Sequence, residues 1–366
     1  MSEHDPAKLR RGWTTGACAT AATKAAYTAL LTGEFPDPVE ITLPKGETPS
    51  FALACEERGE GFARAGIVKD AGDDPDVTHG ATVISTVRLK ASGSGVTFRA
   101  GEGVGTVTRE GLPVPPGEPA INPVPRRMIE DTVAEVAKGH GGNGVVEVEI
   151  SIPGGEELAQ KTMNPRLGII GGLSVLGTTG IVRPFSCASW IASIHRGIDV
   201  ANAAGQTHVV GATGSTSEDA VRKLYDLPDY AFLDMGDFAG GLLKYLRQHP
   251  VERLTLAGGF AKFVKLAQGA LDLHSARSQV DFAALSQVLM SAGAPRYLAE
   301  KARHANTAKE VLDLARTHGI EVADIVAAQA REAAKRILRE SPVDCEVLIV
   351  DRQGVMIGKA GFDADA

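Results

Sequence analysis

The 366-residue sequence is poor in cysteine and has no closely spaced cysteine pair. The four cysteines are Cys18, Cys55, Cys187 and Cys345. Because no CxxC pair is present, neither a structural zinc site nor a disulfide framework is indicated. We expect free thiols of the kind found in a reducing cytoplasm.

The sequence also lacks a segment that could enter a membrane. The N-terminal stretch MSEHDPAKLRRGW has no apolar signal-peptide core, and no run approaches the roughly 20 apolar residues that span a bilayer. An excess of positive charge is missing too, since 38 Lys and Arg face 45 Asp and Glu, for a net charge of −7. We expect a soluble cytoplasmic protein that is drawn neither to nucleic acid nor to a membrane. An anionic ligand must therefore meet a local group of basic side chains.

What is present is the composition of a globular protein, with 43% hydrophobic and 23% charged residues. A chain of this length favours two domains over one. We predict a mixed α/β fold, with an α+β domain over residues 1–160 and an α/β domain over residues 161–366. The second domain should hold a parallel or mixed sheet and a helical C-terminal region. The oligomeric state stays open, and a homo-oligomer is one option.

The first half of the chain combines an Ala-rich helix with short strands. Thr14 precedes the helical stretch and Gly33 follows it, which are a favoured first cap and a favoured last cap. Four β-rich runs between residues 39 and 98 predict an antiparallel or mixed sheet. A Gly- and Pro-rich loop over the sheet, a helix and a strand are expected at residues 101–129, 127–139 and 144–152.

The second half has a different rhythm. The strand-like runs THVVGA, YAFLDM and RLTLAGG are each followed by a helical stretch, which predicts βαβ units on a parallel sheet. Residues 280–339 have a helical pattern. The final run DCEVLIVDRQGVMIG predicts a hairpin that turns at residues 352–354.

Two Gly-rich segments are candidates for ligand binding. In residues 168–184, GIIGGLSVLGTTGIVRP, glycines would let a ligand approach backbone N–H groups, or would instead let two chain segments cross closely. In residues 209–225, a Gly-rich turn follows a strand and opens a helix, which suits an anion or the edge of a nucleotide. The second turn lacks the GK[ST] ending of a Walker loop, so it equally fits an ordinary capped turn.

Two further segments carry charged side chains. Residues 67–80 hold Asp70, Asp73, Asp74, Asp76 and His79 in one loop, which could bind a divalent cation or serve as acid and base. Alternatively, it is a solvated turn whose aspartates cap backbone N–H groups. We expect crowding to raise the pKa of at least one of these carboxyls. In residues 257–275, Lys262 and Lys265 lie one turn apart and could attract carboxylates or form a solvated face, with His274 nearby.

Taken in order, these strings resemble the CbiD family, the cobalt-precorrin-5B (C(1))-methyltransferases of cobalamin biosynthesis. The resemblance runs through GWTTGACATAATKAA, VKDAGDDPDVTHG, GEGVGTVTREGL, GEPAINPVPRRMI, NPRLGIIGGLSVLGTTGIVRP and GGFAKFVKLAQG. It covers nearly the whole chain, although the turn at residues 211–219 and the helical C-terminal third carry little of it. It implies methylation of a corrin ring carbon by S-adenosylmethionine in the anaerobic branch of the pathway, with cobalt-precorrin-6A as product.

We assign candidate roles to residues on these grounds. The proposed catalytic residues are Asp70, Asp73, Asp74 and His79. The proposed cofactor-binding residues, for S-adenosylmethionine, are Gly171, Gly172, Gly177, Thr178, Thr179 and Gly180. The proposed residues for the anionic cobalt-corrinoid substrate are Thr14, Thr15, Lys69, Arg126, Arg127, Lys262 and Lys265. No protein-bound metal is expected, because a methyl sulfonium reacts without one.

Two other classes of function remain possible at this stage. A carrier that binds a corrinoid or another tetrapyrrole would need the basic residues but not a cofactor segment. A nucleotide-dependent transferase would use the turn at residues 211–219 as a phosphate site.

Overall fold

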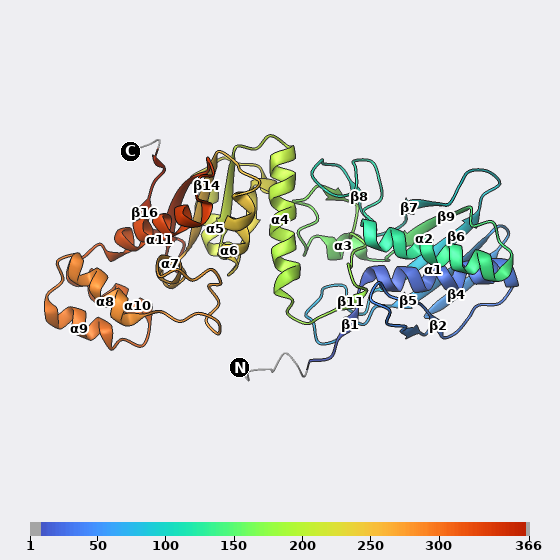
Figure 1. Cartoon of the computed structure of the whole chain (residues 1–366), viewed down its shortest axis with the longest axis horizontal. Coiled ribbons are helices and arrows are strands. Elements are labelled where there is room, and N and C mark those ends of the chain that lie inside the picture. The colour runs from blue at the N-terminus through green and yellow to red at the C-terminus, as the bar shows by residue number, and fades with distance from the viewer. Residues whose placement is uncertain (1–8, 364–366) are drawn as a thin grey trace. The chain divides into compact units, whose positions relative to one another are not determined.

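The computed structural model describes residues 9–363 and divides the chain into two compact units, Met1–Cys187 and Ala188–Ala366 (Figure 1). The mixed α/β class is confirmed. The division lies beyond the boundary expected near residue 160, because two short strands after that point pair with the N-terminal part of the chain. β10 (Ile169–Ile170) pairs with β8 (Thr106–Val107), and β11 (Ile181–Val182) pairs with β1 (Gly12–Trp13), both antiparallel.

Unit 1 is built on a five-stranded mixed sheet, which confirms a mixed sheet, but the first of the four predicted runs lies outside it and pairs in a separate two-stranded sheet. Its strand order is β4 (Cys55–Gly59), β5 (Phe62–Val68), β6 (Thr82–Leu89), β9 (Val146–Ser151) and β7 (Val96–Ala100). The pairs are antiparallel except for β7 with β9. A two-stranded sheet of β2 (Val39–Glu40) and β3 (Ser50–Phe51) accompanies it. Buried side chains alternate along β9, so one face of the sheet packs on the core.

The predicted first helix is confirmed as α1 (Thr15–Thr32). The Thr14 hydroxyl accepts the Ala17 N–H at its start, and Gly33 closes its end in the left-handed conformation with φ +90°. Its many alanines are fully buried, and it packs against β5, β6 and a second helix, α2 (Pro123–His140) (Figure 1). Small side chains allow this close packing on several sides at once.

The second helix begins four residues before its predicted start. Pro123 and Pro125 lie in its first turn, where the missing proline N–H groups would have no helical partner in any case. Gly141 ends α2 in the left-handed conformation. A short helix, α3 (Gly155–Ala159), follows β9.

Unit 2 confirms the predicted βαβ pattern and the final hairpin. Its strand order is β13 (Phe232–Asp234), β12 (His208–Ala212), β14 (Arg253–Gly259), β15 (Asp344–Val350) and β16 (Met356–Ala360). The first four strands are parallel, and β16 runs antiparallel to β15.

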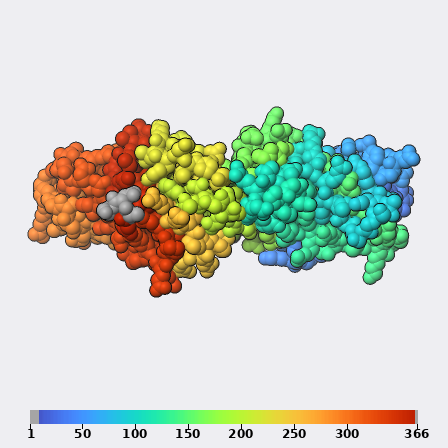
Figure 2. All heavy atoms as spheres, turned by 90° about the horizontal axis from the view of Figure 1, so that it is seen from above, coloured from blue at the N-terminus to red at the C-terminus, as the bar shows by residue number. Residues whose placement is uncertain are grey.

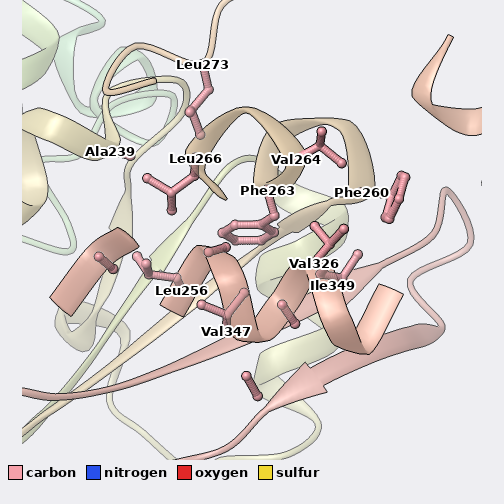
Figure 3. Close-up of a cluster of buried hydrophobic side chains, with 14 of the residues drawn as sticks. Ala239, Leu256, Phe260, Phe263, Val264, Leu266, Leu273, Val326, Val347 and Ile349 are labelled. Atoms are coloured by element: carbon pink, nitrogen blue, oxygen red, sulfur yellow. The ribbon is translucent and has the colours of Figure 1, made fainter. Parts of the chain in front are cut away.

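Helices cover both faces of this sheet. One face packs against α4 (Cys187–Ala203), α6 (Ala239–Leu246), α7 (Phe260–Ala267) and α11 (Val322–Leu338), in a core that includes Leu256, Phe263 and Val347 (Figure 3). The other face packs against α5 (Ser215–Arg222) through Val221, which contacts Val210, Phe232, Ala257 and Leu348. The β12–β13 crossover through α5 therefore covers one face of the sheet, and the crossovers through α6 and through α7 and α11 cover the other.

The helical C-terminal region is also confirmed. It consists of α8 (Phe282–Ser291), α9 (Arg296–Arg303), α10 (Ala308–Arg316) and α11. Asp281 and Thr307 cap α8 and α10 by accepting backbone N–H groups. In Figure 2 the orange surface of α8–α10 lies against the red surface of the C-terminal segment, as the shared core requires.

Candidate functional site

Three segments that are distant in sequence meet in unit 1. Trp13 lies opposite Ile181 in the β1–β11 pair, and the Thr14 N–H donates to the Gly180 carbonyl at 2.9 Å. The Trp13 N–H donates to the Asp70 carbonyl at 2.7 Å. The N-terminal strand is thus hydrogen-bonded both to the Asp-rich loop and to the first Gly-rich segment. We call residues 10–16, 69–80 and 176–185 together the three-segment junction.

Two glycines let these backbones approach each other. A Cβ atom on Gly12 would lie 2.0 Å from the Ala71 carbonyl carbon, and one on Gly72 would lie 2.2 Å from the Arg10 carbonyl oxygen. Such distances are impossible for a real side chain, so the crossing requires glycine at both positions. The Asp73 N–H donates to the Arg10 carbonyl at 3.0 Å beside this crossing.

Three glycines of the proposed cofactor segment likewise allow another part of the chain to approach the backbone closely. A Cβ atom on Gly177 would meet the Thr14 hydroxyl oxygen at 2.3 Å, one on Gly180 would meet Leu43 at 2.5 Å, and one on Gly172 would meet the Gly103 backbone at 2.3 Å. The chain itself therefore occupies the space before these glycines. Gly171 faces open space, Thr178 is exposed, and the Thr179 hydroxyl accepts the Ile181 N–H at 3.3 Å.

The aspartates of the loop fix backbone and basic groups. Asp70 pairs with the guanidinium of Arg10 and accepts the Gly72 N–H at 2.9 Å. Asp73 accepts the Arg10 N–H at 2.6 Å, and Asp74 accepts the Phe185 N–H at 2.8 Å. These contacts match the backbone-capping alternative, extended to segments far away in sequence.

The expected rise in a carboxyl pKa is not found at Asp70. The hydrogen bond from Arg10, aided by the Gly72 N–H and the Arg10 charge, lowers the pKa of Asp70 to about 2. Burial alone would raise the pKa of Asp76, but the charge of Lys69 and hydrogen bonds from Lys69 and Thr78 outweigh it, and that pKa is lowered too. Basic partners, which the crowding argument left out, decide both directions.

His79 and Lys69 lie at the two ends of this loop. The Nδ1 atom of exposed His79 accepts the Ala71 N–H at 3.1 Å, so a neutral His79 carries its proton on Nε2. The Lys69 side chain is only 1% exposed and is paired with Asp76, which places its ammonium group inside the loop and not at a ligand-accessible surface.

The other proposed substrate residues differ in their accessibility. Thr14 and Thr15 are buried at the start of α1, and Thr14 is its cap. Arg126 donates to the Ile121 carbonyl at 2.8 Å, to the Pro119 carbonyl at 3.0 Å and to Glu118 at 3.2 Å, so it holds the loop that precedes α2. Arg127 is exposed.

The two proposed lysines lie in unit 2, whereas the three-segment junction lies in unit 1. Both donate to the Leu273 carbonyl, Lys262 at 3.3 Å and Lys265 at 3.0 Å, and Lys262 also pairs with Asp237. Lys265 is 7% exposed, and burial together with the neighbouring Lys262 charge lowers its pKa.

Sequence reasoning missed Arg10 and Arg183. Arg10 forms the ion pair that orders the loop, and Arg183 is exposed directly after β11. The contact between Arg10 and Asp70 cannot be predicted from the sequence, because 60 residues separate them. The one available signal was the Arg-Arg-Gly run that precedes Trp13.

Residues 9–363 lack two features, a group of metal-binding side chains and a membrane-spanning helix. Within this range no three His, Cys, Asp or Glu side chains are grouped so that they could hold a metal ion. Over the same range no helix has the length and apolar character needed to cross a membrane.

Comparisons with known proteins cover both units. The model of the CbiD family matches residues 2–184, and the model described as CbiD, C-terminal domain matches residues 272–361. The chain is 65% identical over 355 residues to the cobalt-precorrin-5B C(1)-methyltransferase of Brucella canis, covering 97% of this chain and 96% of that protein. The protein of the same name in Brucella melitensis biotype 1 is 65% identical over 356 residues, with the same coverage. The crystal structure of the cobalamin biosynthesis protein cbiD from Archaeoglobus fulgidus matches with a TM-score of 0.40 and 26% identity, over 85% of each chain.

A matched pair of glycine variants tests the crossing at the junction. Gly177 and Gly171 both have positive φ, +137° and +85°, so alanine is strained at either position, but only at Gly177 would its Cβ atom collide with Thr14. We expect Gly177→Ala to lower the free energy of unfolding by about 1–3 kcal/mol more than Gly171→Ala does. Urea denaturation of both variants measures the difference. Equal losses would show that Gly177 is not needed for packing.

Proposed function

The chain belongs to the CbiD family, and on this premise we propose that it is the methyltransferase that places a methyl group on C-1 of cobalt-precorrin-5B. The identity of 65% over 97% of the chain to proteins of that name is the observation that carries the proposal. The product is cobalt-precorrin-6A, and the enzyme acts in cobalamin biosynthesis. The cobalt ion belongs to the substrate and not to the protein.

We propose S-adenosylmethionine as the methyl donor. The ring carbon forms a bond to the methyl carbon while the carbon–sulfur bond breaks, and the electron pair of that bond stays on sulfur, so S-adenosylhomocysteine leaves. This displacement needs no metal and no covalent enzyme intermediate. The protein contributes by aligning the two reacting atoms and excluding water. Of the six residues first assigned to the donor, Gly171, Thr178 and Thr179 are the ones that chain packing leaves most accessible.

The substrate carries several acetate and propionate groups, so an enzyme with a net charge of −7 must bind it through local cations. Arg127 is exposed and has the charge for this role, and Arg11 and Arg183 offer two more exposed guanidinium groups beside the junction. Arg126 is a positioning residue, because it holds the loop before α2. The buried ammonium of Lys69 orders the Asp-rich loop instead of meeting the substrate.

The Asp-rich loop supplies the groups that could take a ring proton as the product relaxes. Asp70 is held as a carboxylate by Arg10, and Asp74 is held by the Phe185 N–H, so these two position the loop. Asp73 is exposed and accepts the Arg10 N–H, and His79 is exposed as well. We propose Asp73 as the proton acceptor, whereas His79, whose Nδ1 atom accepts the Ala71 N–H, helps to hold the loop.

We further propose that the enzyme acts in the cytoplasm. The support is that all four cysteines, Cys18, Cys55, Cys187 and Cys345, are free thiols. Two of them, Cys18 and Cys345, are buried, where burial raises their pKa values and keeps the thiols protonated.

The direct test is incubation of the purified chain with S-adenosylmethionine and a cobalt-precorrin-5B preparation. We expect the macrocycle to gain the mass of one methyl group and S-adenosylhomocysteine to appear in equal amount, as measured by mass spectrometry. A chain that binds the macrocycle but leaves its mass unchanged would be a carrier. A reaction that needs ATP would favour the nucleotide-dependent alternative.

The same assay tests the role of Asp73. Asp73→Asn keeps an oxygen that can accept the Arg10 N–H, so the melting temperature should stay close to that of the wild type. A proton acceptor would be lost, and turnover should fall roughly 10²-fold with both ligands still bound. Asp313→Asn, at an exposed carboxylate of α10, is the control for removing one charge. Normal turnover of Asp73→Asn would remove Asp73 from the mechanism.

A further inference from the structure

The parallel sheet of unit 2 has a topological switch point between β12 and β14. β12 continues into α5, which packs on one face, and β14 continues into α7, which packs on the other face, although β12 and β14 are neighbours. In open parallel sheets, ligands bind outside the carboxyl ends of the strands at such a point. The second Gly-rich turn of the sequence lies there.

One glycine at this edge is packed by the chain and two are open. The Thr213 N–H donates to the Ala257 carbonyl at 2.9 Å, and a Cβ atom on Gly258 would lie 2.5 Å from the Thr213 hydroxyl oxygen. These contacts join the ends of β12 and β14. Nothing lies within 4 Å of a Cβ atom on Gly214 or Gly259, so their backbone is accessible to a ligand.

The end of β13 brings acidic residues to the same edge. Asp234 is the register partner of Ala212, and the Gly236 N–H donates to the Ala212 carbonyl at 3.1 Å. Asp237 follows and pairs with Lys262 at the start of α7. In nucleoside-binding βαβ units, an acidic residue after the second strand accepts the ribose hydroxyls, about 20 residues beyond the Gly-rich turn.

An exposed tryptophan is fixed beside these residues. Trp190 of α4 is 46% exposed, and its Nε1–H donates to the Asp234 carbonyl at 2.9 Å. Its ring lies 3.2 Å from the position of a Cβ atom on Gly236, and the Phe238 ring centroid is 6.1 Å away. A large aromatic ring that is held in one orientation and still faces solvent provides a surface on which a purine can stack.

The lysines add positive charge next to this surface. Lys262 is one-third exposed and Lys265 is buried, and both donate to the Leu273 carbonyl. Asp237 pairs with Lys262, and the charges of Asp237 and Asp272 both act on Lys265. A ligand carboxylate would supply a further anion for the two cations.

We propose that this edge, made by Trp190, Gly214, Asp237, Gly259 and Lys262, binds the adenosyl amino acid that donates the methyl group. The indole of Trp190 stacks on the adenine, Asp237 accepts the ribose hydroxyls and Lys262 faces the α-carboxylate. The inference rests on the proposed function for the identity of the donor. It competes with the assignment of the donor to residues 171–180.

The two tryptophans of the chain separate the two locations. Trp190 lies at the sheet edge, whereas Trp13 lies opposite Ile181 in the first Gly-rich segment. In Trp13→Phe, S-adenosylhomocysteine should quench the fluorescence of Trp190 saturably, with the dissociation constant that calorimetry gives for the wild type. In Trp190→Phe, the fluorescence of Trp13 should stay unchanged. A saturable change confined to Trp190→Phe, or calorimetric binding without a change in either variant, would overturn the proposal.

Two variants measure the contribution of side chains at the edge. Asp237→Asn and Trp190→Ala should each weaken binding of S-adenosylhomocysteine about tenfold or more. Asp313→Asn removes a carboxylate that is likewise paired with a lysine, and should leave the affinity unchanged. Wild-type affinity in both edge variants would contradict the proposal. Failure of the wild type to bind S-adenosylhomocysteine at all would instead refute the proposed function on which it rests.

Discussion

The close crossing of backbones at Gly12 and Gly72 is the constraint on which unit 1 depends. Glycine has no Cβ atom, and a Cβ atom at either position would collide with the facing backbone. The N-terminal strand can therefore hydrogen-bond to the Asp-rich loop on one side and to β11 on the other. The crossing brings the Arg10 guanidinium to Asp70, which lowers the pKa of that carboxyl, and brings the Arg10 N–H to Asp73. Local chemistry in the junction thus follows from a steric condition on two glycines.

The same crossing places carboxylates of the Asp-rich loop next to cations and backbone N–H groups. Asp70 is paired with Arg10 and Asp76 with Lys69, so cations balance these two charges, and Asp74 accepts the Phe185 N–H. Arg11, Arg127 and Arg183 are exposed, and Arg11 lies 3.8 Å from Glu47. In unit 2, the sheet topology and not the net charge places basic and acidic side chains at one edge.

Local patterns predicted most of the regular elements. The caps Thr14 and Gly33, the βαβ rhythm and the final hairpin were correct, since each depends on residues close in sequence. The β1–β11 pair could not be predicted, because two-residue strands have no periodicity and their partners are about 170 residues apart. For the same reason the expected boundary near residue 160 differs from the division at Cys187. The directions of the aspartate pKa shifts depend on Arg10 and Lys69, contacts that only the fold creates.

Amide hydrogen exchange in Gly12→Ala tests the constraint at the junction most directly. A methyl group at this position has to displace the Ala71 backbone, so exchange should accelerate together in residues 10–16, 69–80 and 176–185, while β12 and β14 of unit 2 keep their wild-type protection. Acceleration limited to residues 10–16, with the Asp-rich loop and the Gly-rich segment still protected, would contradict the account.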